Sequence, residues 1–177
     1  TAEAVAKKWN ISREKQDDFA FNSHKKALIA IEKEYFKSGI APVTVKETYL
    51  DENEKKQEKE SIIDKDEGPR KEISRDALKK LRSVFTKEGT VTAGNSSQTS
   101  DGTAFVVIMS EKMVKELNIQ PLARLLSYSV AGVEPKHMGI GPVAAVPIAL
   151  RKAKLKLEDI EQIELNEAFA SQSLAVI

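Results

Sequence analysis

Apolar positions at helical spacing dominate the first forty residues. Residues 2–9 predict a short helix that Asn10 interrupts, and Ser12 is a suitable N-cap for a second, longer helix. We expect this second helix over about residues 13–37, because Gly39 then provides a stop signal. Its inward positions, at steps of three and four, are Phe19, Ala20, Ser23, Ala27, Ile31 and Tyr35.

The pattern changes after Pro42. Residues 43–46 alternate apolar and polar side chains, which is typical of a strand. Residues 51–60 are almost entirely polar and mostly charged, so we expect a solvated loop there. The Gly68-Pro69 pair predicts a turn, and a short helix is expected after Ser74.

The second half alternates short apolar runs with helical patterns, which predicts an α/β fold with a mostly parallel sheet. A loop of small and polar side chains, residues 90–102, precedes this half. Pro147 lies in one of the predicted helices and must kink it or fall in its first turn. The predicted strands are 104–109, 123–131 and 163–166, and the helices are 110–117, about 142–153, and one directly after 166.

Composition limits the class of protein. The chain has 177 residues, 41% hydrophobic and 31% charged, which is a globular balance sufficient for one domain or one and a half small ones. A net charge of +1 gives no reason to expect nucleic acid or an acidic membrane as a partner. No apolar run is long enough to span a bilayer, and no export leader is expected. The chain begins at Thr1 and ends on an apolar helix, so we expect truncation at both ends.

The reactive side chains are few. The chain has no cysteine, which excludes disulfides, cysteine-ligated zinc and a thiol nucleophile within these residues. His24 and His137 are the two histidines and lie far apart in the sequence, so no metal site is expected. Gly139-Ile140-Gly141 resembles half of a dinucleotide-binding fingerprint, but a tight turn into a helix explains it better.

Asn166 is the most informative polar residue, because it lies where a strand is predicted to pass into a helix. Ligands collect at the carboxyl ends of strands in α/β sheets, and a carboxamide there can hold a water molecule or an oxyanion. The simpler alternative is that Asn166 is the N-cap of the helix and that Glu167 interacts favourably with the helix dipole.

Four stretches together resemble one known family, the thiolases, which comprise acetyl-CoA acetyltransferases and 3-ketoacyl-CoA thiolases. They occur in the order and at the spacing of the family, and the resemblance covers all 177 residues. It implies a thiolase loop domain over residues 1–98, mostly helical, then the tail of the N-terminal α/β half over 99–120 and the start of the C-terminal half over 121–177. The stretches are residues 1–6 with 11–17, residues 89–97 with 101–102, residues 137–142, and Asn-Glu-Ala-Phe-Ala at 166–170.

The resemblance also implies a chemistry. Thiolases transfer acyl groups between CoA thioesters through an acyl-cysteine, either condensing acetyl-CoA or cleaving 3-ketoacyl-CoA, with CoA as substrate and no covalently bound cofactor. By this resemblance Asn166 would anchor an oxyanion-hole water, and Met138 would line the acyl and thioester pocket. Ser97 would meet the pantetheine of CoA, and Arg70 would lie at its adenosine-phosphate end. A cytoplasmic homodimer or homotetramer, acting in fatty acid metabolism, is implied for the parent protein.

The chain departs from the family at several points. Ala77 stands where the family often has a CoA-contacting serine. Neither histidine falls on a catalytic position of the family; we read His24 as a helix surface residue and His137 as a turn residue near the pocket. The family's nucleophilic cysteine precedes the matched region, and its catalytic histidine and second cysteine follow it. We therefore expect the chain alone to be inactive.

Two further expectations follow. The alternative to a catalytic role is a non-catalytic CoA-binding or subunit-assembly module. In either case an incomplete sheet would expose apolar strand edges, so we expect self-association or weak order after residue 120.

Overall fold

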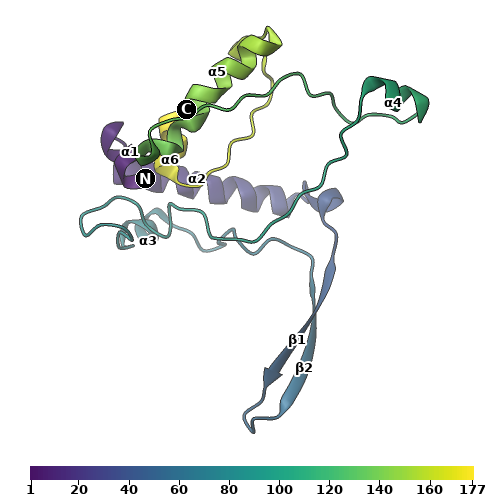
Figure 1. Ribbon diagram of the computed structural model, residues 1–177. Helices are drawn as coiled ribbons and strands as arrows, with labels where there is room; N and C mark the ends of the chain where they lie inside the picture. The colour runs from purple at the N-terminus through teal and green to yellow at the C-terminus, as the bar shows by residue number, and fades with distance from the viewer.

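The computed structural model describes residues 1–177 as a small group of helices from which long segments extend (Figure 1). Its one sheet is a two-stranded antiparallel hairpin. No helix is both long and apolar enough to cross a membrane. In chain order the α-helices are α1 (Ala2–Lys8), α2 (Arg13–Glu32), α3 (Arg75–Lys79), α4 (Glu111–Glu116), α5 (Gly141–Ala153) and α6 (Ala170–Val176); the 3-10 helices are η1 (Lys37–Gly39), η2 (Pro135–Ile140) and η3 (Leu157–Asp159); the strands are β1 (Val43–Leu50) and β2 (Lys56–Ile63).

The core lies where α6 packs against α1 and α2 and where η2 closes against α1 and α6. Figure 1 shows α6, at the end of the chain, beside α1, at its beginning. Only 14 of the 177 residues are buried, so the core is confined to this contact and to the loop and α3, which lie against α2. Its apolar members are Ala2, Val5, Ala6, Ala20, Leu78, Val91 and Ala170.

Three serines begin helices, as the sequence predicts. Ser12, Ser74 and Ser110 each accept a hydrogen bond through Oγ from the backbone N–H three residues later, at distances between 3.1 and 3.3 Å. Each satisfies one of the amide groups that a helix leaves without a partner in its first turn. The N-cap prediction for α2 at Ser12 is therefore confirmed.

The long helix α2 ends at Glu32, five residues earlier than predicted. Glu34 takes a left-handed backbone conformation with φ of 55°. The N–H of Glu34 then donates to the carbonyl of Ile31 at 3.0 Å, and the N–H of Tyr35 donates to the carbonyl of Ala30 at 2.9 Å. This pair of bonds is a Schellman termination, and its usual residue in the left-handed position is glycine. The sequence offers Gly39 instead, which explains the error.

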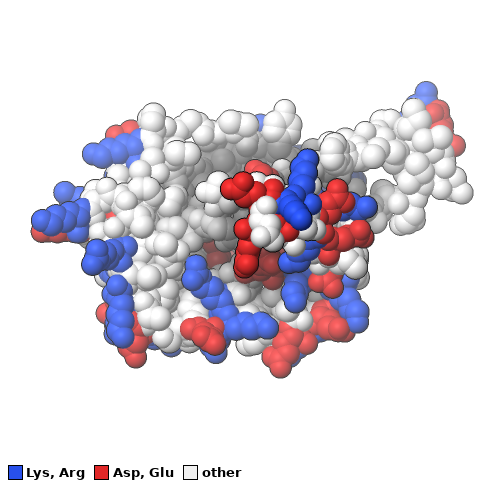
Figure 2. All heavy atoms as spheres, turned by 90° about the horizontal axis from the view of Figure 1, so that it is seen from below, with Lys and Arg blue, Asp and Glu red and all other residues white.

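The charged run at 51–60 is not only a loop, which corrects the prediction. Residues 51–55 form a turn, and β2 then returns antiparallel to β1 with Lys46 opposite Glu60 and Glu47 opposite Lys59. Opposite charges at facing positions stabilise such a pair, although charged residues have low strand propensity. Figure 1 shows the hairpin projecting from the helices, and Figure 2 shows acidic and basic side chains interspersed over the face from which it projects.

Asp51 organises the turn of the hairpin. One oxygen, Oδ1, accepts hydrogen bonds from the backbone N–H groups of Asn53 and Lys55, each at 2.9 Å, and Oδ2 accepts one from Gln57 Nε2 at 2.9 Å. Because these bonds favour the ionised carboxylate, with the Gln57 bond contributing most, the pKa of Asp51 lies below its ordinary value.

The three predicted strands of the second half do not form a sheet. Residues 104–109, 123–131 and 163–166 are extended but lack ladder partners, and the predicted parallel pairing is corrected. Their apolar side chains face solvent; Phe105 is 91% exposed and Val130 is 87% exposed. A strand needs a neighbouring strand to accept and donate its backbone hydrogen bonds, and none pairs with these segments.

Serine side chains fasten one of these extended segments to α5. Ser127 Oγ donates to the carbonyl oxygen of Ala149 at 2.7 Å, and Ser129 Oγ donates to that of Ala145 at 2.6 Å. Helix α5 itself begins at Gly141 and contains Pro147 in its interior. The chain therefore runs along a helix where a sheet neighbour was predicted.

Candidate functional site

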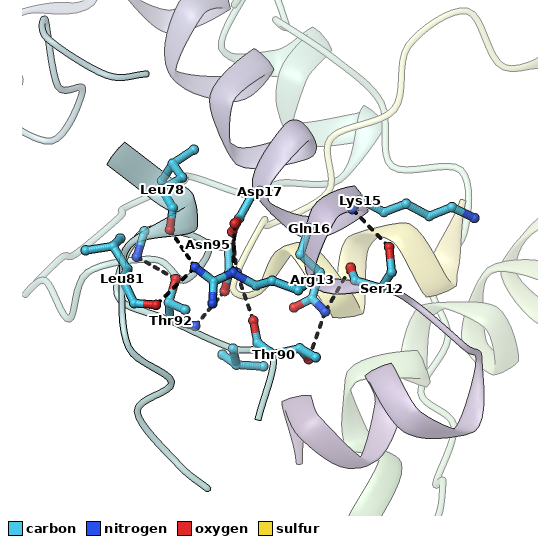
Figure 3. A network of polar contacts seen from close by, with 12 residues as sticks. Ser12, Arg13, Lys15, Gln16, Asp17, Leu78, Leu81, Thr90, Thr92 and Asn95 are labelled. Carbon is cyan, nitrogen blue, oxygen red and sulfur yellow. Dashed lines mark hydrogen bonds and ion pairs between the residues drawn. The ribbon is translucent and has the colours of Figure 1, made fainter. Parts of the chain in front are cut away.

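Asn95 fixes the loop of small residues from inside the molecule (Figure 3). It is 2% exposed. Its Oδ1 accepts from the backbone N–H of Thr92 at 2.8 Å, and its Nδ2 donates to Asp17 Oδ1 at 2.9 Å and to the carbonyl oxygen of Thr90 at 3.1 Å. The carboxamide thus uses both ends, once toward helix α2 and twice toward its own loop, so the loop conformation is strongly specified.

The start of the loop is held by α1. The carboxylate of Glu3 accepts hydrogen bonds from the backbone N–H groups of Thr90 and Val91, each at 2.9 Å. Gly89 is required beside it, because a Cβ there would collide with this carboxylate. Gln16 on α2 adds a bond from Nε2 to Thr90 Oγ1 at 3.0 Å. Both N-terminal helices therefore position the loop.

Arg13 joins α2 to α3 in the same network, as Figure 3 shows. Its Nε donates to Asp17 Oδ2 at 2.7 Å, while Nη2 donates to the carbonyl oxygens of Leu78 and Leu81. Leu78 lies in the last turn of α3 and Leu81 just beyond its end, so the guanidinium adds a donor where a helix lacks backbone donors. Asp17, which is almost fully buried, is thereby paired with a cation on one oxygen and with Asn95 on the other.

The loop pairs directly with the segment that contains Asn166. The N–H of Ser97 donates to the carbonyl oxygen of Ala168 at 2.9 Å, and the N–H of Ala170 donates to the carbonyl oxygen of Asn95 at 3.0 Å. Helix α6 begins only at Ala170, with Phe169 as its N-cap residue. The prediction of a helix directly after residue 166 is therefore wrong, and so is the alternative in which Asn166 is its N-cap.

A cavity of about 600 Å³ lies over this pairing, within the size range of small-molecule sites. Its lining comes from α2, from the loop, from the segment 166–170 and from Gly68-Pro69. Both Ser97 and Asn166 line it. The remaining lining residues are Phe19, Ala20, Ser23, His24, Ala27, Gly94, Asn95, Ser96, Gln98, Glu167, Ala168, Phe169 and Ala170.

A second cavity, of about 1240 Å³, adjoins the first and shares Ser97 and His24 with it. Arg70 lines this second space. The second cavity has charged residues of both signs in its lining, which are Lys65, Asp66, Glu67, Arg70 and Asp101. Carboxylates thus outnumber cations there, and Arg70 and Lys65 supply the positive charge that a phosphate would need.

The structure therefore brings together three of the four predicted site residues. Asn166 and Ser97 line the first cavity, and Ser97 and Arg70 line the second. Met138 does not join them; it lies on η2, is 63% exposed, and lines neither cavity. Ala77, on α3, is likewise outside both linings.

His24 is the residue that the sequence interpretation missed. It is half-buried rather than a plain helix surface residue, lines both cavities, and accepts a hydrogen bond at Nδ1 from the backbone N–H of Arg70 at 3.1 Å. Burial lowers its pKa below the ordinary value, the Arg70 guanidinium lowers it further, and the Glu167 carboxylate opposes both. The signal that could have identified it is its spacing, since His24 lies four residues after Ala20 and three before Ala27 and so shares their face of the helix.

Ser23, next to His24 on α2, forms a hydrogen bond with the segment 166–170, which also lines the first cavity. Its Oγ donates to Glu167 Oε2 at 2.5 Å. Helix α2 therefore contacts both the Arg70 segment and the residue that follows Asn166.

His137 lines neither cavity. Its Nδ1 is 2.8 Å from Glu134 Oε2, and its ring meets Trp9 edge-on with the ring centroids 5.7 Å apart. The hydrogen bond from His137 lowers the pKa of Glu134 below its ordinary value. No group of three or more histidine, aspartate or glutamate side chains is arranged to hold a metal ion.

Comparisons with known proteins point to one family. The model of the thiolase N-terminal domain matches residues 1–112, and that of the thiolase C-terminal domain matches residues 119–177. A 3-ketoacyl-CoA thiolase of Bacillus subtilis (strain 168) is 50% identical over 177 residues, which are 100% of this chain and 45% of that protein. A probable acetyl-CoA acyltransferase of Staphylococcus aureus (strain COL) is 48% identical over 176 residues, 99% of this chain and 43% of that protein.

Solved structures show the same relationship. The crystal structure of the Bacillus anthracis acetyl-CoA acetyltransferase matches with a TM-score of 0.89 and 48% identity, over 99% of this chain and 42% of that one. Human mitochondrial 3-ketoacyl-CoA thiolase in complex with CoA matches with a TM-score of 0.84 and 43% identity, over 99% and 41%.

The chain thus spans less than half the length of these relatives. Its backbone nevertheless follows theirs over nearly all of its residues, although it contains few strands of its own. Two family models together match most of the chain, and relatives near 50% identity match the whole of it. The chain belongs to the thiolase family and has a partial α/β thiolase fold.

Proposed function

We propose that this chain supplies the CoA-binding side and one oxyanion anchor of a thiolase that transfers acyl groups between CoA thioesters. The observation that carries the proposal is the shared cavity of Ser97 and Asn166, whose segments are joined by the bond from Ser97 N–H to the Ala168 carbonyl. The small residues of the loop allow a thioester to approach the backbone closely. The carboxamide of Asn166, which lines the same cavity, provides a hydrogen-bonding group, and a thioester site requires both.

Each residue has a distinct role in the proposal. The carboxamide of Asn166 holds a water molecule that stabilises a developing oxyanion. Ser97 meets the pantetheine arm, and Arg70, in the adjoining cavity, provides a fixed positive charge for the phosphates. Met138 is proposed for the acyl pocket on the family resemblance alone, since it lines neither cavity.

The acyl-cysteine itself requires a sulfur that this chain does not contain. We therefore propose that the 177-residue chain is inactive by itself and that the nucleophile and the proton-transfer groups belong to another part of the parent polypeptide. The lack of cysteine also favours a second candidate, a non-catalytic module that binds CoA or mediates subunit assembly.

The wider assignment is part of the same proposal. Residues 1–98 correspond to the loop domain, 99–120 to the tail of the N-terminal α/β half and 121–177 to the start of the C-terminal half. For the parent protein we propose a cytoplasmic homodimer or homotetramer in fatty acid metabolism, using CoA as substrate without a bound cofactor.

Calorimetric titration of the chain with CoA tests the proposed site. Arg70→Ala and Ser97→Ala should each weaken CoA binding by about three- to tenfold, the effect of losing one polar contact. Arg82→Ala, which removes an exposed arginine outside both cavities, is the matched control and should leave binding unchanged. Tight CoA binding that neither Arg70→Ala nor Ser97→Ala affects would contradict the assigned positions.

A thiolysis assay distinguishes the two candidates. The isolated chain should show no turnover of acetoacetyl-CoA above the uncatalysed rate. A parent polypeptide carrying the two cysteines and the histidine should be active if the catalytic proposal holds. An inactive parent that still binds CoA would favour the non-catalytic module.

A further inference from the structure

His24 lies on the inward face of α2 and lines both cavities, as do Gly68 and Pro69. Arg70 follows these two residues directly and lines the second cavity only. The position of the Gly68–Arg70 backbone therefore sets the position of the Arg70 side chain.

The only hydrogen bond in the structure that the Arg70 backbone N–H makes is to His24. Its N–H donates to Nδ1 of the imidazole at 3.1 Å, and no backbone acceptor takes this donor. Because Nδ1 accepts, it carries no proton, and the neutral ring must carry its proton on Nε2. The bond links α2, which is anchored in the core, to a turn that has no regular secondary structure.

We propose that His24 is a positioning residue: by accepting the backbone N–H of Arg70 at Nδ1, it fixes the Gly68–Arg70 turn and so places the Arg70 guanidinium at the second cavity. The inference rests on the proposed function, since it takes CoA as the ligand whose phosphates Arg70 meets. His24 need not touch the ligand, because its effect is transmitted through the position of Arg70.

The charges around the ring support the neutral, accepting form. Arg70 and Glu167 face it from the two segments packed against α2, and they shift its pKa in opposite directions. Burial adds to the effect of Arg70, and together they keep the pKa of His24 below its ordinary value. Protonation would place a hydrogen on Nδ1 and remove the acceptor that the Arg70 N–H uses. The other charged residues that line the second cavity are Lys65, Asp66, Glu67 and Asp101.

The decisive variants are His24→Asn and His24→Ala. Asparagine places Oδ1 near the position of Nδ1, so it retains an acceptor but cannot be protonated near neutral pH. Alanine removes the acceptor. By calorimetry near neutral pH, His24→Ala should weaken CoA binding by about fivefold, the effect of one lost hydrogen bond, and His24→Asn should stay within about twofold of the wild type.

A double-mutant cycle separates positioning from general stability. In the Arg70→Ala background, His24→Ala should change CoA affinity by less than about twofold, because the group that His24 positions is already absent. Equal effects of His24→Ala in both backgrounds would overturn the inference, since His24 would then act independently of Arg70.

A measurement without ligand keeps this result separate from the proposed function. In the isotope-labelled full chain, a nitrogen–nitrogen coupling through the hydrogen bond should connect Arg70 N with His24 Nδ1, and it should vanish as the imidazole is protonated. Backbone order at Gly68 and Arg70 should be retained in His24→Asn and reduced in His24→Ala. If CoA binds to no variant, the proposed function fails, and these NMR data decide the positioning alone. A missing coupling, or equal order in all variants, would overturn it.

Discussion

The backbone N–H of Ser97 donates a hydrogen bond to the carbonyl oxygen of Ala168 across 2.9 Å. This bond brings the loop of small residues to the segment that contains Asn166, although the two are distant in the sequence. Two features that resemble thiolase signatures separately are thus parts of one surface. Any change that moves one of them is expected to move the other.

Asn95 should be the residue on which this arrangement depends most. In Asn95→Ala the buried Asp17 loses a hydrogen bond, and the Thr92 N–H loses its acceptor inside the molecule. Leaving buried polar groups unpaired costs about 1–3 kcal/mol each, so we expect the free energy of unfolding to fall by at least about 2 kcal/mol.

Urea unfolding followed by circular dichroism measures this loss. Asn22→Ala, at an exposed position of α2, is the control and should change the free energy of unfolding by less than about 0.5 kcal/mol. If the two alanine variants proved equally stable, the network would not hold the loop.

Gly139 should not tolerate a side chain. A Cβ at this position would lie 2.8 Å from Cγ and 3.1 Å from Cβ of Gln172, which is buried on α6. Gly139→Ala should therefore push η2 away from α6 and lower the free energy of unfolding by about 1–3 kcal/mol.

Gly141→Ala is the matched control, because a Cβ there would meet no atom within 4 Å. It lies in the first turn of α5, where alanine is also the better helix former. The melting temperatures of the two variants give the comparison, and a Gly139→Ala chain that melts with the wild type would mean that η2 does not pack closely on α6.

Stability should depend on pH through His24. Its pKa is lowered in the folded chain by burial and then by Arg70, from an ordinary value of 6.5. The unfolded chain therefore binds the proton first as the pH falls, so the stabilisation from the neutral ring is complete above pH 6.5 and is lost below it.

We expect the free energy of unfolding of the wild type to fall more steeply than that of His24→Asn between about pH 7 and pH 5. Urea titrations of both chains across this range measure the difference. Parallel pH profiles would show that His24 titrates equally in the folded and unfolded states.

The apolar side chains of residues 104–109 should promote self-association. Phe105 and Val107 are 91% and 86% exposed, on a segment whose backbone groups have no strand partner. Sedimentation at increasing protein concentration should reveal oligomers, which Phe105→Asp and Val107→Asp together reduce and Thr103→Asp, the control, does not. A monodisperse monomer with full amide-exchange protection over residues 160–177 would contradict both association and weak order after residue 120.

Local signals in the sequence predict the structure well where the cause is local. Ser12 caps its helix as expected, and the helices predicted near Ser74 and Ser110 begin with the same serine cap, because a cap depends on residues within one turn. The resemblance to thiolases identifies the family, because its four stretches keep their order and spacing.

Features that depend on distant partners could not be predicted in this way. Residues 56–63 form a strand although they are mostly polar, since the charges on β1 complement theirs. Residues 104–109 read as a buried strand, yet pairing requires neighbours that this chain does not place beside them. The hydrogen bond from the Arg70 amide to His24 joins residues 46 positions apart and could not be read from helical spacing.

In the proposed function CoA binds across the two adjoining cavities, with its pantetheine arm beside Ser97 and its phosphates beside Arg70. Nuclear Overhauser contacts between bound CoA and the isotope-labelled chain test this most directly. We predict contacts from the pantetheine protons to Ser97 and Ala168, with phosphate-dependent shifts at Arg70. Saturating CoA that perturbs only residues outside these cavities would contradict the account.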